Sequence, residues 1–295
     1  MSKKTNTAPL LTMRNVHIKG LSDEKWVDII NGVGLDLNRG EVLGLIGESG
    51  AGKSTLGLAA MGFCRDGCKI TDGAIAFDGL DLLNQNRQQL RQLRGRRIAY
   101  VAQSAAASFN PAHRLIDQFC EAPLKHAVMG RAEAENYATS LYERMNLPDP
   151  DEFGLRYPHE VSGGQLQRAM TAMALSCRPD LIIFDEPTTA LDVTTQIEVL
   201  AAIRDIVKQF NTAAIYISHD LAVVAQMADT IKVLLKGDEV EQATTVKMLK
   251  SPVEDYTKSL WAVRKYARAE QQPVTSPQPV IEISNVTAGY SPRQD

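Results

Sequence analysis

Eight consecutive residues have the composition of a phosphate-binding loop. They fit the pattern G-x-x-x-x-G-K-[ST] and are Gly47, Glu48, Ser49, Gly50, Ala51, Gly52, Lys53 and Ser54, with Thr55 directly after them. Glycines let the backbone curl so that successive N–H groups face phosphate oxygens, and a helix that starts here adds its positive dipole end. In such a loop the lysine reaches the β- and γ-phosphates and the serine hydroxyl ligates Mg²⁺. The loop predicts a site for a nucleoside triphosphate.

Two adjacent acids, Asp185 and Glu186, follow an apolar run at residues 181–184. Proteins with a phosphate-binding loop complete the Mg²⁺ site with a carboxylate at the end of a buried strand. Asp185 is therefore expected beside the metal. Glu186 would stand at the carboxyl end of the strand, where open α/β sheets bind ligands, and is expected to polarise the attacking water. An isolated Asp-Glu pair would more simply be a solvated turn, but the phosphate-binding loop argues against that reading.

A second anion-binding helix start is predicted in the middle of the chain. Its residues are Val161, Ser162, Gly163, Gly164 and Gln165, and a helix is expected from Gln165 to Leu175. One nucleotide does not need two phosphate cradles in one domain. Two domains that face each other head to tail do need them, because each cradle then closes over the nucleotide bound to the other domain.

Buried strands and helices alternate around these motifs. Apolar runs at residues 42–46, 181–184 and 213–217 predict strands that are buried on both faces. Helices are expected from Lys53, from about Val193 and over residues 221–227. This alternation predicts a parallel sheet covered by helices.

Two further regions depart from that alternation. Residues 10–18 and 34–37 predict N-terminal strands, separated by a polar, turn-prone insert that includes residues 20–26. Residues 112–178 are strand-poor and rich in helix-forming residues, which predicts a helical subdomain inserted into the sheet.

Composition excludes several classes of protein. The 295 residues are 44% apolar and 23% charged, which is ordinary for a globular chain, and the net charge of −3 gives no basic field for nucleic acid. No run approaches the roughly 18 apolar residues of a membrane span, and the N-terminus lacks the apolar region of a secretory signal. Of the four cysteines, Cys64 and Cys68 are spaced as metal ligands can be, but reduced thiols are the better interpretation because no histidine or second pair is near.

Over residues 10–265 the sequence resembles the ATP-binding subunits of ABC transporters. The phosphate-binding loop, Gln103, the segment 161–165, Asp185-Glu186, residues 190–192 and His219 occur in family order. The resemblance implies an α/β fold with a P-loop NTPase (RecA-like) core, an N-terminal antiparallel β subdomain and an α-helical subdomain inserted at about 104–178. The implied cofactors are ATP and Mg²⁺.

The resemblance also implies roles for single residues. Glu186 would be the general base, with His219 contacting the γ-phosphate. Gln103 would contact Mg²⁺ and the attacking water, beside the metal ligands Ser54 and Asp185. Asp192 would belong to a loop across the dimer interface. The signature begins with Val161 where the family usually has leucine.

Within this family, four shorter segments resemble the sequences of the oligopeptide, dipeptide, nickel and opine importers. The segments that carry this likeness are residues 109–111, 157–160, 185–194 and 251–260. The resemblance implies an ATP-hydrolysing motor on the cytoplasmic face of the inner membrane. Its implied partners are a second ABC domain and two transmembrane permease subunits, which are expected to dock near residues 104–160. A periplasmic or extracellular solute-binding protein would act through the permeases. No nucleic acid is implied as a partner. A soluble ABC ATPase outside transport, a non-hydrolysing scaffold and an exporter motor are the alternatives.

The end of the chain repeats its beginning. Residues 280–290 match residues 10–20 in their Asn-Val pair and in the apolar alternation before it, whereas 268–279 are polar and Pro-rich. We therefore expect an ABC domain at residues 1–267, with a subfamily tail at about 246–267. A linker at 268–279 and the first strand of a second ABC domain at 280–295 would follow, the alternative being an unrelated C-terminal strand.

One family feature is missing. The aromatic residue that usually stacks on adenine aligns with Gly20, which cannot stack. Trp26 could replace it, or Trp26 could simply cover the core, and the sequence does not choose between the two. In the repeat the matching residue is Tyr290.

Overall fold

A computed structural model describes residues 8–188 and 192–262 together with Ser284. A six-stranded sheet with the strand order β10-β9-β3-β8-β7-β6 lies at its centre. Its strands are β3 (Val42–Ile46), β6 (Ile98–Val101), β7 (Leu181–Asp185), β8 (Ala213–Ile217), β9 (Thr230–Leu235) and β10 (Asp238–Thr244). All pairings are parallel except that of β10 with β9. The predicted parallel sheet is confirmed, and the three predicted strands are β3, β7 and β8.

The N-terminal part forms a second, antiparallel sheet with the order β2-β1-β4-β5. Its strands are β1 (Leu11–Ser22), β2 (Lys25–Leu37), β4 (Cys68–Phe77) and β5 (Leu80–Asp81). The expected insert at residues 20–26 is wrong, because only Asp23 and Glu24 form the turn, both with positive φ. The strands on either side pair as far as Ser22 and Lys25, so cross-strand pairing overrides the turn-like composition.

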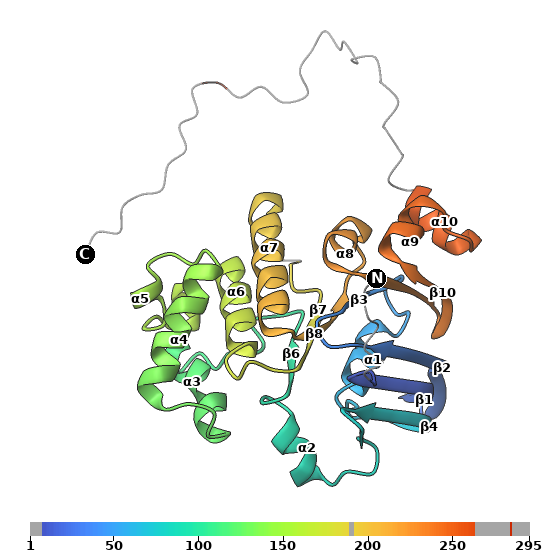
Figure 1. Cartoon of the computed structure of the whole chain (residues 1–295), viewed down its shortest axis with the longest axis horizontal. Helices are drawn as coiled ribbons and strands as arrows, with labels where there is room; N and C mark the ends of the chain where they lie inside the picture. Colours follow the sequence, from blue (N-terminus) through green and yellow to red (C-terminus); the bar gives the residue numbers. More distant parts are fainter. Residues whose placement is uncertain (1–7, 189–191, 263–283, 285–295) are drawn as a thin grey trace, which may run out of the picture.

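Two apolar cores lie on opposite faces of the central sheet. Ile183, Ile215 and Ile217 belong to the core shared with the antiparallel sheet and α1 (Lys53–Ala59). Phe184 and Tyr216 belong to the core shared with the helices of the other face. Those helices are α7 (Val193–Phe210) and α8 (Leu221–Met227) (Figure 1). Successive residues of one strand point to opposite faces, which is why these strands are apolar throughout.

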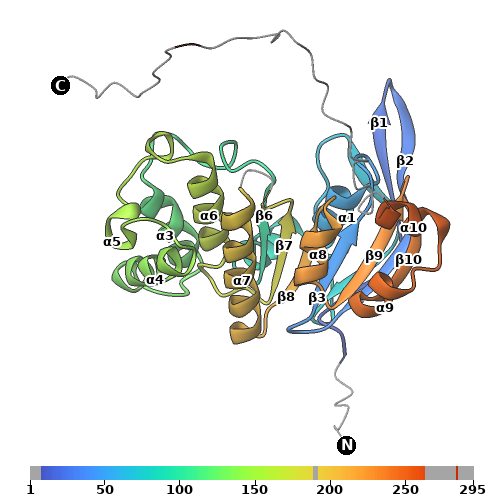
Figure 2. The ribbon, with the colours of Figure 1, turned by 90° about the horizontal axis from the view of Figure 1, so that it is seen from above.

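The helical subdomain lies at one end of the molecule and the antiparallel sheet at the other (Figure 2). Its elements are α3 (Leu115–Lys125), α4 (Arg131–Arg144), α5 (Pro150–Phe153), the 3₁₀ turn η1 (Pro158–Glu160) and α6 (Gly163–Ala174). A short helix, α2 (Arg87–Leu93), precedes β6. Among the described residues, 104–178 contain no strand, as the sequence predicts for an inserted helical region.

Two short helices end the described chain. They are α9 (Thr245–Lys250) and α10 (Asp255–Ala262), and both lie beside β10 (Figure 2). No helix among the described residues is both long and apolar enough to span a bilayer. The linker and the repeat predicted at 268–295 lie outside the described residues, apart from Ser284.

Candidate functional site

The phosphate-binding loop joins the end of β3 to the start of α1. Gly52 is the N-cap of α1 and has a φ of 92°, a left-handed conformation that favours glycine. A Cβ atom at this position would lie 2.5 Å from Cδ1 of Ile30 on β2. Both the conformation and the close approach of β2 therefore require glycine here.

Lys53 is folded back into this loop. Its Nζ donates to the carbonyl oxygens of Gly47 and Glu48, each at 2.8 Å, and the residue is 6% exposed. Burial lowers the pKa of Lys53, although the carboxylates of Glu186 and Asp185 act in the opposite direction. The ammonium is therefore already inside the loop, where a phosphate would exchange with the two carbonyl oxygens.

Asp185 is held through both carboxylate oxygens. The Ser54 hydroxyl donates to Oδ1 at 2.8 Å, and the Tyr100 hydroxyl donates to Oδ2 at 2.6 Å. Asp185 is 3% exposed, so a buried carboxylate and a serine hydroxyl form one oxygen-rich corner. Burial and the bond to Asp185 raise the pKa of Tyr100, which keeps its phenol protonated as a donor.

Glu186 lies between the two other predicted catalytic residues. Nε2 of Gln103 donates to Oε2 of Glu186 at 3.0 Å, and Nδ1 of His219 lies 3.1 Å from Oε1. An ionised carboxylate only accepts hydrogen bonds, so the tautomer of His219 that fits this contact is the one with its hydrogen on Nδ1. Glu186 has a φ of 49°, a left-handed conformation that is uncommon outside glycine. The end of β7 and the loops after β6 and β8 thus bring three residues together from distant parts of the sequence.

A pocket beside the loop collects most of the predicted nucleotide contacts. It is lined by Ile29, Ser49, Gly50, Gly52, Lys53, Ser54, Thr55, Gln103 and Glu186. Gly47, Glu48 and Ala51 form the rest of the loop, and Asp185 lies behind it on Ser54. The pocket therefore unites the loop with Glu186 and Gln103.

The predicted second cradle is not part of this pocket. Ser162 and Gly163 are exposed at the start of α6. Oγ of Ser162 accepts from the Gln165 amide at 3.3 Å and Oε1 of Gln165 accepts from the Ser162 amide at 3.0 Å, which is a capping box. The box occupies the amides of Ser162 and Gln165, and the amides of Gly163 and Gly164 take no part in it.

Asp192 also lies outside the pocket. It is the N-cap of α7 and accepts from the Thr195 amide at 3.0 Å. The family loop before it falls on residues 189–191, which are outside the described residues.

Trp26 and Gly20 face opposite sides of the antiparallel sheet. A Cβ atom at Gly20 would lie 2.5 Å from Cδ1 of Ile29, the residue of β2 that lines the pocket. Trp26 pairs with Leu21, one position further along β1, and Nζ of Lys69 lies 3.9 Å from its ring centroid. Ile29 fills the space beside Gly20, and Trp26 lies on the other side of the sheet.

Sequence reasoning missed three residues at the site: Tyr100, Ile29 and Tyr256. Tyr256 on α10 accepts a hydrogen bond from the Glu48 amide at 3.3 Å, so the C-terminal helix touches the phosphate-binding loop. Tyr100 could have been noticed from its place in the run 98–101, three residues before Gln103. Ile29 and Tyr256 carry no local signal, because their positions depend on the packing of distant segments.

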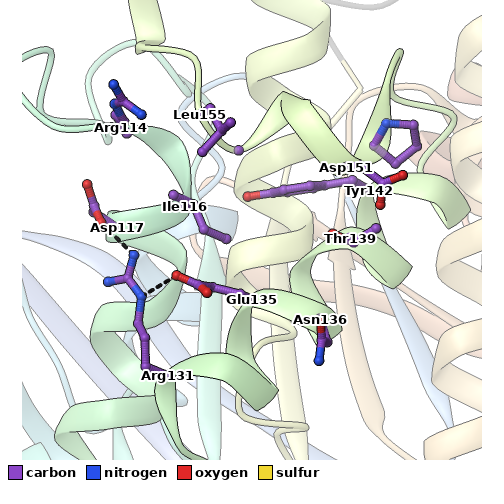
Figure 3. Close-up of a pocket in the computed structure, with 12 residues that line it drawn as sticks. Arg114, Ile116, Asp117, Arg131, Glu135, Asn136, Thr139, Tyr142, Asp151 and Leu155 are labelled. Carbon is purple, nitrogen blue, oxygen red and sulfur yellow. Dashed lines mark hydrogen bonds and ion pairs between the residues drawn. The ribbon is translucent and has the colours of Figure 1, made fainter.

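A larger pocket of about 600 Å³ lies in the helical subdomain. Figure 3 shows Arg131 reaching both Asp117 and Glu135, at 2.7 and 2.6 Å. These carboxylates raise the pKa of Arg131 and neutralise its charge within the pocket. Arg114 also lines this pocket, and Leu155 on its lining has an exposed fraction of 52%.

Comparison with known proteins agrees with this geometry. Residues 30–189 match the family described as ABC transporter. A probable D,D-dipeptide transport ATP-binding protein of Escherichia coli is 40% identical over 252 residues, which cover 85% of this chain and 77% of that protein. The ATP-binding protein of the metal-staphylopine import system of Staphylococcus aureus is 40% identical over 258 residues, covering 87% of this chain and 93% of its own.

A solved structure shows the same fold. It is a dimeric post-hydrolysis state of the ATP-binding cassette MJ0796 bound to ADP and Pi. It superposes with a TM-score of 0.72 at 23% identity, and the match covers 80% of this chain and 98% of that one.

Proposed function

Because this chain belongs to the ABC transporter family, we propose that it is the ATP-hydrolysing subunit of an importer for peptide-like or opine-like solutes. The observation that carries the proposal is the position of Glu186, held between Gln103 and His219 at the mouth of the phosphate-binding loop. The names of the relatives, which are transport and import proteins, favour this proposal over a soluble ABC ATPase.

Glu186 acts as the general base. It takes a proton from water as the water oxygen bonds to the γ-phosphorus and the bond to the β–γ bridging oxygen breaks. Lys53 and the loop amides neutralise the phosphate charge, and His219 and Gln103 orient the carboxylate. Phosphoryl transfer needs little covalent help, so positioning and charge neutralisation supply the catalysis.

The residues present fit a magnesium ion. Mg²⁺ prefers hard oxygen donors and is usually bound through one or two carboxylates together with substrate phosphates. Ser54 and Asp185 provide a hydroxyl and a buried carboxylate in contact with each other, and the Gln103 amide lies on the same pocket. When bound, Mg²⁺ neutralises charge on the β- and γ-phosphates.

The complete site needs a second ABC domain. Ser162, Gly163, Gly164 and Gln165 lie outside the pocket of their own chain, and Ser162 and Gly163 are exposed. A head-to-tail mate supplies these residues, and Asp192 lies at the same interface. The mate is a second copy of this chain or a domain that begins with the repeat at residues 280–290.

Two permease subunits bind this protein at the membrane, on its cytoplasmic face, and a solute-binding protein delivers solute to them. We place their docking surface on residues 104–160, where Leu155 is exposed beside the pocket of Figure 3. Copurification of the native protein from detergent-solubilised membranes should yield two multi-span subunits. Leu155→Glu should release them without changing the ATPase rate of the isolated protein, and their absence from the wild-type preparation would contradict the proposal.

The catalytic proposal is tested with Glu186→Gln. We expect phosphate release to fall by at least about a hundredfold, which is typical for loss of a general base, while ATP binding persists. Glu133→Gln changes an exposed glutamate on α4 and should leave the rate unchanged. Unchanged phosphate release by Glu186→Gln would show that the protein is a non-hydrolysing scaffold or uses another base.

A further inference from the structure

We propose that Tyr100 is a positioning residue of the Mg²⁺ site and that its hydroxyl sets the rotation of the Asp185 carboxylate. The inference rests on the proposed ATPase function. Each carboxylate oxygen of Asp185 accepts from a different hydroxyl. The Ser54 hydroxyl donates to Oδ1 at 2.8 Å, and the Tyr100 hydroxyl donates to Oδ2 at 2.6 Å. Together the two donors fix the rotation of the carboxylate plane.

The sheet places Tyr100 on the correct face to do this. β6 pairs in parallel with β7, and Tyr100 stands opposite Ile183. Alternation puts Ile183 and Asp185 on one face of β7, so Tyr100 shares a face with both. This face is covered by α1, since Ile183 lies 3.1 Å from a Cβ atom built at Gly57. Ser54 approaches Asp185 from the same helix.

Removing the phenol hydroxyl would free the carboxylate to turn. Asp185 is 3% exposed, so water does not readily replace a lost donor, and a buried ionised acceptor without a partner is costly. The carboxylate would rotate to share the Ser54 hydrogen. The Ser54 oxygen can ligate Mg²⁺ while the Ser54 hydrogen points to Oδ1. A rotated carboxylate would draw this hydrogen to a new position and turn the Ser54 oxygen away from the metal.

Tyr100 belongs to a short segment that contacts both acids at the end of β7. Three residues after Tyr100, Gln103 donates to Oε2 of Glu186 at 3.0 Å. β6 and the loop that follows it therefore hold Asp185 through Tyr100 and Glu186 through Gln103. The metal-side acid and the general base keep their relative positions because the same short segment contacts both.

The test compares Tyr100→Phe with wild type and with Tyr142→Phe, which removes a hydroxyl from a buried tyrosine in the helical subdomain. A fluorescent ATP analogue is titrated first in EDTA and then with increasing Mg²⁺, and bound Mn²⁺ is followed by electron paramagnetic resonance. Loss of an outer-shell partner commonly weakens metal binding by about 10- to 100-fold. We expect the half-saturating Mg²⁺ concentration of Tyr100→Phe to rise by about tenfold and its Mn²⁺ spectrum to change. The metal-free affinity for nucleotide should stay at the wild-type value.

Two results would overturn the inference. One is a Tyr100→Phe protein with the wild-type Mg²⁺ dependence and Mn²⁺ spectrum. The other is a variant whose metal-free binding falls as much as its metal-dependent binding, because that would mark general damage to the fold. A wild-type protein that binds no nucleotide at all would overturn the proposed function, and this inference with it.

Discussion

Ile29 lies beside Gly20, the position at which the related proteins usually have an aromatic side chain. It fills the space beside Gly20 and lines the nucleotide pocket, whereas Trp26 packs under Lys69 on the other side of the sheet. An aliphatic side chain can still cover one face of a purine through apolar contact. Trp26 is 43% exposed, belongs to neither apolar core and does not line the pocket.

This gives a prediction at the residue scale. Ile29→Ala should weaken ATP binding by about 1 kcal/mol, roughly fivefold, because it removes apolar contact with the base. Trp26→Ala is the matched control and should leave the affinity unchanged. Titration with a fluorescent nucleotide measures both variants. A larger loss of affinity in Trp26→Ala than in Ile29→Ala would return the adenine contact to Trp26.

At the scale of elements, β9 and β10 share an unusual ion pair. Lys232 on β9 is 1% exposed and pairs with Glu239 on β10. Burial lowers the pKa of Lys232, although Glu239 acts in the opposite direction. Between that lowered value and the ordinary value of 10.5, the unfolded chain binds more protons than the folded one. The stability contributed at this position therefore rises with pH across that window.

Lys232→Met should abolish this dependence. As the pH rises toward 10.5, the free energy of unfolding of wild type should increase relative to that of the variant. Urea unfolding at several pH values measures the difference, and Lys247→Met, which changes an exposed lysine on α9, serves as the control. A difference that stays constant or shrinks over this range would mean that Lys232 keeps its proton throughout.

At the scale of the whole molecule, the pocket at the phosphate-binding loop and the start of α6 are separate parts of one chain. The phosphate-binding loop shares its pocket with Ile29 of β2 and with Glu186 after β7, while Ser162 is exposed at the start of α6 in the helical subdomain (Figure 1). A head-to-tail dimer would place the loop of one domain against the α6 start of the other. Variants that damage opposite halves should therefore complement each other.

Lys53→Ala and Ser162→Arg test this arrangement. Each variant alone should hydrolyse almost no ATP, because each symmetric dimer lacks one half of both sites. An equimolar mixture should recover up to about a quarter of the wild-type sites, since half of the dimers are mixed and each mixed dimer contains one complete site. Phosphate release measures the recovery. A mixture as inactive as its components would argue against a dimer of this chain and favour a different mate.

The local features of this protein can be predicted from short stretches of its sequence. Residues 47–54 predict the phosphate-binding loop, and the strands predicted at 42–46 and 213–217 have the observed bounds. These features depend on neighbours in the chain, since a buried parallel strand must be apolar on both faces and a phosphate cradle needs glycine before a helix. The roles of Asp185 and Glu186 are likewise predicted from their place directly after an apolar run.

Contacts between residues that are distant in the sequence could not be predicted in this way. Hydrophobic patterning does not encode that β3 lies between β8 and β9, or that Tyr100 stands opposite Ile183. Strand order and register bring the Tyr100 hydroxyl to Asp185, and they carry Gln103 and His219 to Glu186. The hairpin turn at Asp23 likewise moves Trp26 away from the pocket and leaves Ile29 in it. Such contacts join residues far apart in sequence, so they arise from the packing of the whole molecule.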